Sequence, residues 1–445
     1  MSNRTQSILF LSHLGGMNGG AERSLLAIVR YLAQKGYRPI VIVPEEGVLY
    51  EALRQVGCTV YIVPFNWWTQ TSMLSDQELT GIKLHNATAL RRIQDIIAAE
   101  KPVVSITNTL VAPWLAYASA LTNTPHAWFL REFGVADHNL QFMLSESAVF
   151  RTVATLSSKI FVNSKAMQLH FAQALDLDPD TIAISYPYVQ LASSGAAPDP
   201  FIADTQLKII AVGQIKPSKG QFDAVKAVKL LRDSHGIRAQ LCLVGIEEDT
   251  AYVAEIRAYI AKHALADAVI FLGFAPNPQA IMQYASLAVV CSRNEAFGRV
   301  VVEAMLAKLP VIGHRSAGIQ EIIDDGKTGL LYDTPKDLAA AARLLATDPK
   351  KAAALERAAF TKASKTYSLE NVMRPILQFV QQSSVTQLDL SLMEGVFALH
   401  AQQEQTIQYI TQERADAQQQ LQAILQSRKW QLIGKVAKVA HRFKR

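Results

Sequence analysis

The chain has 445 residues, of which 50% are apolar and 18% are charged, so it can form two or three globular domains with sizeable cores. Its formal net charge of +6 lies at the end of the chain, because residues 428–445 carry +7 and the rest therefore carries −1. A nearly neutral body argues against a nucleic-acid-binding surface on the folded domains.

We expect a cytoplasmic protein without disulfides or metal sites. The polar N-terminus leads into an apolar run that is too short for a signal peptide, and there is no stretch of about 18 apolar residues that would cross a membrane. The three cysteines, Cys58, Cys242 and Cys291, are far apart and lie in apolar segments. This pattern is typical of buried free thiols in a reducing compartment, and it has no metal-ligand spacing.

In the first part of the chain, short apolar runs alternate with helical patterns. A Gly-rich loop follows the first run, and Gly36 stops the amphipathic helix predicted over residues 21–36. The predicted strands are 7–12, 39–44, 59–64, 102–108, 125–130 and 159–164. Strands that alternate with helices in this way predict a parallel, doubly wound sheet.

A segment rich in Pro, Ala, Gly and Ser, residues 191–204, breaks this pattern and is predicted to be a linker. The alternation of strands and helices then restarts, which predicts a second sheet. Its predicted strands are 207–213, 239–245, 268–273, 287–292 and 310–314. A further helix begins near residue 368 and is expected to be interrupted by Pro375.

The predicted fold is therefore α/β, with two Rossmann-like, doubly wound parallel-sheet domains that face a cleft and a C-terminal helical tail. The expected parts are domains at 1–190 and 205–367, a helix at 368–384 that returns toward the first domain, and a tail at 385–445. Ligands of open parallel sheets bind at the carboxyl ends of the strands. A cleft between two such sheets suits a donor held by one domain and an acceptor held by the other.

The loop after the first predicted strand, "SHLGGMNGGAERS", is rich in glycine: Gly15, Gly16, Gly19 and Gly20. Glycines let the backbone approach a ligand closely, and the N-terminus of the next helix favours phosphate. The loop lacks the G-x-G-x-x-G pattern of dinucleotide-binding proteins, so a dehydrogenase loses its main support. The alternative is that the glycines only allow a tight turn.

In the corresponding loop of the second sheet, the strand ends at Gly213, and Lys219 and Gly220 open the next helix. A lysine at a helix N-terminus is repelled by the helix dipole unless an anion lies between them. Such a local inconsistency points to an anion-binding role for Lys219. Lys216 is interpreted as a solvated loop charge.

Two glutamates, Glu295 and Glu303, lie eight residues apart around a helix predicted to start near Gly298. Both are expected to project from the carboxyl edge of the sheet into the cleft. Carboxylates repel phosphates but accept hydrogen bonds from hydroxyls, so this pair, with a lysine and backbone amides nearby, suits a nucleotide sugar. The alternative is a pair of ordinary glutamates that interact with the helix dipole.

The E-x7-E pair encloses a Phe-Gly dipeptide and is followed by "EAM", "PVIG" and "AGIQEIIDDGKTGLLY". This sequence resembles the donor-site signature of the retaining glycosyltransferases of family four, which have the GT-B fold. The resemblance runs from about residue 7 to residue 380 and is most specific over 292–332.

The resemblance implies that Glu303 binds the ribose hydroxyls of the nucleotide and that Glu295 grips the transferred sugar and acts in catalysis. Lys219 would pair with the diphosphate. The other implied donor-binding residues border the sugar, the diphosphate or the base: Gly19, Gly20, Gly213, Gly273, Phe274, Phe297, Gly298 and Arg299. The resemblance also implies that no metal or other cofactor is required.

The chain departs from the family pattern at two positions. Gln214 replaces a frequent arginine, so positive charge on the diphosphate would come from Lys219, Arg299 or amides. Arg131 stands where many members have a catalytic-site histidine. Arg131 is either a catalytic residue at the cleft or half of a solvated pair with Glu132 at the strand end.

The C-terminal segment 421–445 has one apolar and one basic helical face. This pattern predicts a helix that binds the inner face of a membrane peripherally. The alternatives are a helix packed on the body with a solvated basic face, and non-specific binding of nucleic acid by the basic residues. The Gln-rich segment before it does not indicate self-association, so the oligomeric state stays open.

These observations predict a retaining glycosyltransferase that moves a sugar from a nucleotide-diphosphate donor to a glycan or lipid-linked glycan in surface polysaccharide biosynthesis. Two alternatives stay open: a nucleotide-sugar epimerase of the same fold, and a catalytically silent scaffold that binds a nucleotide sugar or a glycan.

Overall fold

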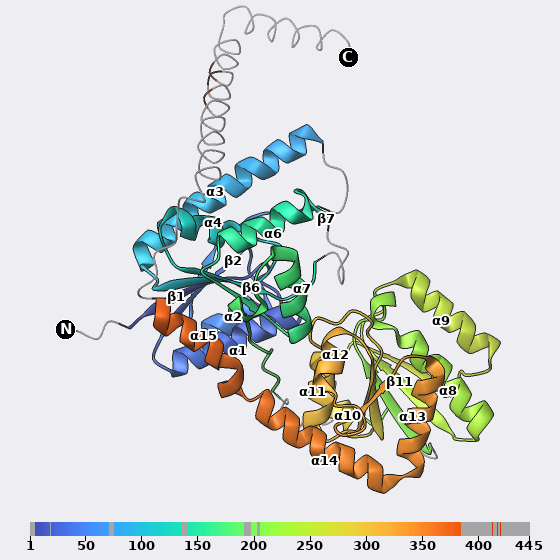
Figure 1. Ribbon diagram of the computed structural model, residues 1–445. Helices are drawn as coiled ribbons and strands as arrows, with labels where there is room; N and C mark the ends of the chain where they lie inside the picture. The colour runs from blue at the N-terminus through green and yellow to red at the C-terminus, as the bar shows by residue number, and fades with distance from the viewer. Residues whose placement is uncertain are drawn as a thin grey trace, which may run out of the picture. The chain divides into compact units, whose positions relative to one another are not determined.

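The computed structural model describes residues 5–17, 19–70, 75–134, 141–190, 197–202 and 205–383, together with residues 412, 416 and 419. The chain divides into two compact units, Met1–Leu388 and Asp389–Arg445. Both parallel sheets belong to the first unit (Figure 1). The predicted membrane-binding and Gln-rich segments of the tail lie outside the described residues, apart from the three isolated positions.

The first sheet contains parallel strands β1 (Ser7–Leu11), β2 (Arg38–Val43), β3 (Thr59–Ile62), β5 (Val104–Thr107), β6 (His126–Leu130), β8 (Lys159–Val162) and β9 (Ile182–Ile184). Their order across the sheet is β3-β2-β1-β5-β6-β8-β9. Every residue of the interior strand β1 is buried, as expected for a parallel sheet with helices on both faces. Ile8 pairs with Pro39 on one side and with Val104 on the other.

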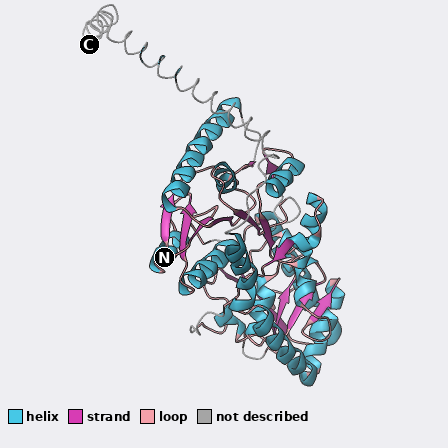
Figure 2. Cartoon of the chain, turned by 60° about the vertical axis from the view of Figure 1, so that its left-hand side comes forward, coloured by secondary structure: helices cyan, strands magenta, loops and turns pink. Residues whose placement is uncertain are grey.

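The helices around this sheet are α1 (Gly20–Gln34), α2 (Val48–Gln55), α3 (Asp76–Glu100), α4 (Trp114–Leu121), α6 (Glu146–Thr155) and α7 (Lys165–Leu175) (Figure 2). Helix α1 buries Leu25, Ile28, Val29 and Leu32. Their three- and four-residue spacing places them on one face, which packs on the sheet. A short antiparallel pair, β4 (Thr69–Gln70) with β7 (Gln141–Phe142), lies outside the main sheet.

The second sheet contains β10 (Leu207–Val212), β11 (Ala239–Val244), β12 (Val269–Gly273), β13 (Leu287–Val290), β14 (Val311–His314) and β15 (Leu330–Tyr332). These parallel strands lie in the order β12-β11-β10-β13-β14-β15. The accompanying helices are α8 (Gln221–His235), α9 (Thr250–Lys262), α10 (Gln279–Met282), α11 (Arg299–Leu306), α12 (Ala317–Ile322), α13 (Pro335–Thr347) and α14 (Pro349–Thr366). Two Rossmann-like parallel sheets confirm the predicted fold class. The three-residue strands β9 and β15 were not predicted.

Helix α15 (Leu369–Gln382) runs through Pro375 without a break, so the expected interruption is wrong. A proline inside a helix removes one backbone hydrogen bond and crowds the preceding turn, but burial of an apolar face offsets that cost. The Ser185 hydroxyl also donates a 2.7 Å hydrogen bond to the carbonyl of Val372. The residues that α15 buries in the core of the first sheet are Val372, Met373, Ile376, Phe379 and Val380.

The three cysteines are buried and free, as expected. Burial raises the pKa of each thiol to about 12, so none is a reactive thiolate near neutral pH. Among the described residues, no helix has the length and apolar character needed to cross a membrane.

If α15 is held by its apolar face, Ile376→Ala will lower the free energy of unfolding by about 2–4 kcal/mol, because it leaves a cavity in the core of the first sheet. Urea unfolding measures this change. Gln381→Ala, at an exposed position of the same helix, will change it by about 0.5 kcal/mol or less. Equal effects of the two substitutions would contradict the packing role of this face.

Candidate functional site

The strand order of the second sheet changes direction between β10 and β13. In open parallel sheets, the loops at such a point separate and leave a crevice outside the carboxyl ends of the strands. The loop after β10 carries Lys219, and the loop after β13 carries Glu295. Because β10 and β13 are parallel neighbours, paired through Ile209 and Leu287, both loops leave the same edge of the sheet.

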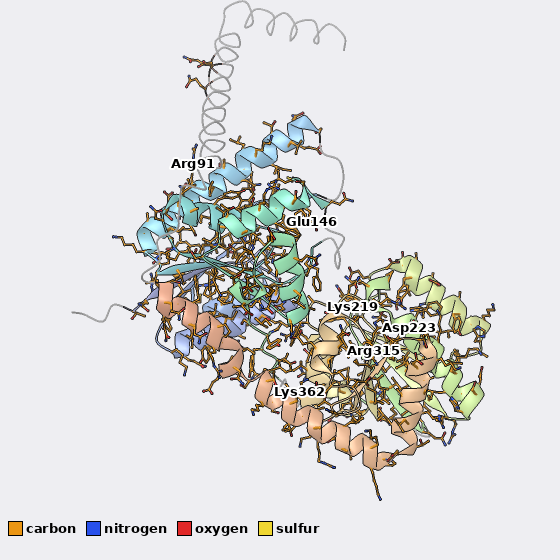
Figure 3. All side chains as sticks on the ribbon, viewed as in Figure 1. Arg91, Glu146, Lys219, Asp223, Arg315 and Lys362 are labelled. Atoms are coloured by element: carbon orange, nitrogen blue, oxygen red, sulfur yellow. The ribbon has the colours of Figure 1, made fainter. Side chains whose placement is uncertain are left out.

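Lys219 and Glu295 form an ion pair at this edge. The distance from Nζ to Oε2 is 2.6 Å, and the two side chains are 30% and 21% exposed. Lys219 ends a short 3-10 turn, Pro217–Lys219, and only Gly220 separates it from α8. Figure 3 labels Lys219 and, on that helix, Asp223. The Glu295 carboxylate is thus the anion that offsets repulsion between Lys219 and the helix N-terminus.

Gly220 lets the two loops come this close. Its φ of +64° lies in the left-handed region, and a Cβ there would be 2.3 Å from the carbonyl oxygen of Cys291. Any other residue would push the start of α8 away from the loop that follows β13. The contact between Lys219 and Glu295 therefore depends on glycine at position 220.

The N-terminal end of α12 holds the loop that carries Glu295. The backbone N–H of Gly318 donates to the carbonyl of Glu295 at 3.0 Å, and the Ser316 hydroxyl donates to the carbonyl of Ser292 at 2.8 Å. A Cβ on Gly318 would lie 2.7 Å from backbone atoms of Phe297. Loop and helix are therefore in direct backbone contact, which restricts the position of Glu295.

Helix α11 begins as predicted, with Gly298 as its N-cap at φ +95°. Glu303 lies on this helix and is only 6% exposed. The Nη2 atom of Arg299 is 3.8 Å from Oε1 of Glu303, and Nη1 donates to the carbonyl of Tyr188 at 3.0 Å. Burial lowers the pKa of Arg299, and the nearby Glu303 carboxylate opposes this shift. A buried carboxylate and a desolvated guanidinium thus lie side by side.

A pocket of about 610 Å³ adjoins these two residues. It is bounded by α1, by the segment after β9, by residues 276–279 and by α11. The lining that the described residues form includes Arg299 and Glu303 but not Lys219 or Glu295. The side chains that line it on α1 are Arg23, Leu26, Ala27, Arg30, Tyr31 and Gln34.

The ion pair and the pocket meet at the start of α11. A Cβ at Gly298 would lie 3.6 Å from Cγ of Glu295, so the Glu295 side chain packs over the N-cap, next to Arg299. On the other side, a Cβ at Gly20 would lie 3.0 Å from Cδ of Arg299. Glu303 and the glycine loop of the first domain therefore both lie close to Arg299, and Glu295 packs on the residue before it.

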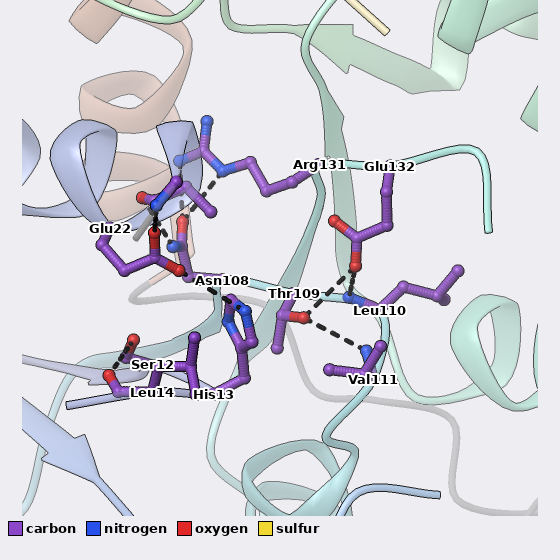
Figure 4. A network of polar contacts seen from close by, with 12 residues as sticks. Ser12, His13, Leu14, Glu22, Asn108, Thr109, Leu110, Val111, Arg131 and Glu132 are labelled. Atoms are coloured by element: carbon purple, nitrogen blue, oxygen red, sulfur yellow. Dashed lines mark hydrogen bonds and ion pairs between the residues drawn. The ribbon is translucent and has the colours of Figure 1, made fainter. Parts of the chain in front are cut away.

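The glycine loop is held by a capping contact. The backbone N–H of Gly19 donates to the Glu22 carboxylate at 2.8 Å, which satisfies an amide at the start of α1. Oε1 of Glu22 lies 3.4 Å from Nε2 of His13 (Figure 4). This contact orders the N-terminus of α1 where it approaches Arg299.

Arg131 is buried, with 7% exposure, so a solvated pair with Glu132 is wrong. Its guanidinium donates to Oδ1 of Asn108 from Nε at 3.0 Å and from Nη2 at 2.7 Å (Figure 4). It also donates from Nη1 to Oδ1 of Asn163 at 3.0 Å. Glu132 instead accepts from the backbone N–H of Leu110 at 2.8 Å. Burial lowers the pKa of Arg131 to about 9, although Glu132 opposes the shift.

Sequence reasoning missed Asn108 and Asn163, although a signal was available. Each follows the last residue of a strand, β5 or β8, and these strands flank β6, which precedes Arg131. Side chains at the carboxyl ends of neighbouring parallel strands meet at one edge. It also missed Arg23 of "GGAERS", for which the sequence offers no comparable pattern.

The remaining predicted residues lie on loops of the second sheet. Gly213 has φ +146°. A Cβ on Gly245 would lie 1.9 Å from the carbonyl oxygen of Gly213. Gly273 ends β12 at φ +77°. Phe274 is 65% exposed and precedes the pocket wall by two residues. Phe297, in contrast, has a buried ring that packs on Tyr186.

Chemically, the site offers two basic and two acidic side chains and several backbone amides. Lys219 and Arg299 suit phosphate oxygens, and Glu295 and Glu303 suit hydroxyl donors. Within the described part of the chain, His, Cys, Asp and Glu nowhere form a group of three that could hold a metal ion.

Two Rossmann-like parallel sheets with a pocket between them define a protein of the GT-B fold. The model of Glycosyltransferase Family 4 matches residues 18–193, and the model of Glycosyl transferases group 1 matches residues 197–362. The chain therefore contains both of these glycosyltransferase-family domains, one on each sheet.

Among curated relatives, D-inositol 3-phosphate glycosyltransferase of Acidothermus cellulolyticus is 32% identical over 179 residues, which are 38% of this chain and 39% of the relative. N-acetyl-alpha-D-glucosaminyl L-malate synthase of Bacillus anthracis is 31% identical over 133 residues, 30% of this chain and 33% of the relative. The chain thus spans less than half of the length of these two relatives.

HepE of Anabaena, solved in complex with UDP, is similar in structure, with a TM-score of 0.68 and 22% identity over 84% of this chain and 100% of HepE. Structures of HepE with UDP-glucose are similar as well. At this level of identity, the comparison supports the fold.

If Gly220 holds the loops together, Gly220→Ala will destabilise the protein more than Gly236→Ala, by about 1–3 kcal/mol. Both glycines have φ +64° and lie at opposite ends of α8, but a Cβ on Gly236 would meet no atom within 4 Å. Gly236→Ala therefore measures only the cost of placing alanine in a left-handed backbone conformation, which is about 1 kcal/mol. Urea unfolding of both variants makes the comparison, and equal losses would contradict the close contact with Cys291.

Proposed function

We propose that the chain is a retaining glycosyltransferase that uses a nucleoside-diphosphate sugar. The observation that carries this proposal is the Lys219–Glu295 ion pair, 2.6 Å long, at the sheet edge beside the pocket of Arg299 and Glu303. A cation for a diphosphate and acceptors for sugar and ribose hydroxyls thus lie on neighbouring segments at one edge of the second sheet. The two glycosyltransferase-family domains support the same activity.

The pocket suits the nucleoside part of such a donor. Its volume of about 610 Å³ lies within the usual range for small-molecule sites. Glu303 would accept hydrogen bonds from the ribose hydroxyls, and residues 276–279, just beyond Gly273 and Phe274, would border the base. The HepE complexes with UDP and UDP-glucose, in the same fold, support a nucleotide-sugar donor.

The diphosphate would lie between Lys219 and the N-terminus of α11, with Gly19 and Gly20 approaching it from the first domain. Exposed Gln214 brings no charge, so Lys219, Arg299 and backbone amides would supply the positive potential. These groups stabilise the negative charge that develops on the leaving oxygen. We propose that no metal or other cofactor takes part.

In the proposed reaction, the bond between the anomeric carbon and the diphosphate oxygen breaks, and its electron pair leaves with the diphosphate. The acceptor hydroxyl bonds to the anomeric carbon on the same face and gives its proton to the departing phosphate. Glu295 would hold a hydroxyl of the transferred sugar while Lys219 neutralises the leaving group. Arg131, fixed by Asn108 and Asn163, would add positive charge on the first-domain side.

The acceptor is proposed to be a glycan or a lipid-linked glycan of surface polysaccharide biosynthesis. This proposal is supported by the basic, amphipathic segment 421–445, which is suited to a membrane surface that carries anionic lipid. The protein would then work peripherally on the inner face of the membrane.

The two glutamates are expected to differ in what they control. Glu303→Ala will weaken UDP binding about 10-fold or more, since a buried carboxylate that accepts ligand hydroxyls is removed. Glu295→Ala will lower the turnover number about 100-fold, because its contacts strengthen in the transition state, and will leave UDP affinity nearly unchanged. Calorimetry with UDP and initial rates of donor hydrolysis or transfer measure these effects.

Glu255→Ala, at an exposed position of α9, is the control and will change neither quantity. The reverse order of effects would contradict the assigned roles. UDP binding without hydrolysis or transfer would instead indicate a silent binding scaffold, and epimerised donor would indicate an epimerase. A thermal-shift screen of UDP-, GDP-, ADP- and dTDP-sugars identifies the donor.

Membrane association has a separate test. Removal of the residues after Gln426 deletes the seven basic residues of the last segment, and each contributes about 1 kcal/mol near an anionic surface. The truncated protein will therefore no longer sediment with vesicles that contain anionic lipid, while UDP binding stays unchanged. Equal sedimentation of both proteins would remove the membrane proposal.

A further inference from the structure

Glu321 of α12, in the second domain, contacts two segments of the first. Its Oε2 accepts a 2.8 Å hydrogen bond from the backbone N–H of Lys165, the first residue of α7. Its Oε1 accepts a 2.6 Å hydrogen bond from the hydroxyl of Tyr186. One carboxylate therefore bridges the domains through both of its oxygens.

Both partners donate hydrogen bonds to the carboxylate. The first amides of a helix have no acceptor within the helix, and the positive end of the helix dipole attracts a negative charge. Tyr186 is a neutral donor, since burial and the neighbouring Glu321 raise the pKa of its hydroxyl. On the α14 side, Lys362 donates to the backbone carbonyl of Glu321 at 3.4 Å and pairs with Asp324 at 3.0 Å.

Helix α12 also holds the loop that carries Glu295, which is called the candidate catalytic loop below. Glu321 lies three residues after Gly318, whose N–H donates to the carbonyl of Glu295. A movement of α12 that separates Glu321 from α7 would therefore pull on the backbone of Glu295. The interdomain contact and the position of Glu295 are linked through a single helix of six residues.

Three aromatic rings join the loop that carries Glu295 to the two places where the chain crosses between the domains. Tyr186 lies in the crossing after β9, Tyr367 lies in the crossing between α14 and α15, and Phe297 follows Glu295 in the candidate catalytic loop. The ring centroids are 5.8 Å apart for Tyr186 and Phe297, 5.3 Å for Tyr186 and Tyr367, and 5.4 Å for Phe297 and Tyr367. Both crossings thus pack against the loop that carries Glu295.

We propose that Glu321 is a positioning residue that couples closure of the two domains to the placement of Glu295. While the Glu321 carboxylate accepts hydrogen bonds from the start of α7 and from Tyr186, α12 holds the loop that carries Glu295 beside the first domain. Without these bonds, the domains separate more often and Glu295 leaves its working position. The catalytic part of this inference rests on the proposed function, whereas the effect on closure does not.

The coupling predicts a particular set of changes. Glu321→Ala removes both hydrogen bonds, so the closed arrangement becomes less populated, and apparent affinity for UDP falls in proportion. We expect UDP affinity and turnover each to fall about 10-fold, as for loss of a charge-assisted hydrogen bond. Tyr186→Phe removes one bond and keeps the ring, and we expect a smaller effect of about 3-fold.

The closure itself is measured without turnover. Spin labels on Leu169→Cys of α7 and Ala254→Cys of α9, both exposed, report the distance between the domains, and the native cysteines are buried. Added UDP will narrow the distance distribution of the otherwise native protein, and Glu321→Ala will broaden it. Gln320→Ala, an exposed neighbour on α12, is the matched control and will leave distances, UDP affinity and turnover unchanged.

Unchanged distance distributions in Glu321→Ala, or equal changes in Gln320→Ala, would overturn the proposal. A protein that closes through Glu321 but neither hydrolyses nor transfers a donor sugar would refute the proposed function and leave the closure role standing. If Glu321→Ala does not fold, Glu321→Gln and Tyr186→Phe decide the question, since each keeps one hydrogen bond and the shape of the side chain.

Discussion

Close contact of backbone with backbone at the carboxyl edge of the second sheet is the constraint on which the site depends. Gly220 lies against Cys291, Gly245 against Gly213, and Gly318 against Phe297. At each contact a Cβ would come within 3 Å of the facing backbone, so only glycine allows the loops to touch. The side chains next to these contacts, Lys219 and Glu295 above all, owe their positions to this packing.

Charges that are brought together in this way and partly withdrawn from water must be balanced. Lys219 pairs with Glu295, and Arg299 lies close to Glu303, so each cation has an acid nearby. Either pair can exchange part of this interaction for a ligand that carries both phosphate and hydroxyl groups. A nucleoside-diphosphate sugar has both, and this match links the electrostatics of the site to the proposed reaction.

The fold and part of the site could be predicted from the sequence because they depend on local patterns. Apolar runs of five to seven residues mark most strands, and the E-x7-E stretch marks the carboxylates. Strands as short as β15 leave too weak a pattern, and the helix through Pro375 depends on tertiary burial that local sequence does not report. The burial of Arg131 depends on Asn108 and Asn163, 23 and 32 residues away in sequence, which only the strand order brings beside it.

The stretch in which the family resemblance is most specific also contains residues that contact the two crossings between the domains. In residues 292–332, Glu303 lines the pocket and Glu321 accepts hydrogen bonds from the first domain. The same stretch contains Phe297 and the backbone contact between Gly318 and Glu295. Phe297 packs on Tyr186 and Tyr367, which belong to the two crossings. In the proposed coupling, a change in domain separation would therefore reach the candidate site through these few contacts. The proposed roles in binding and in closure thus fall on neighbouring residues of one stretch.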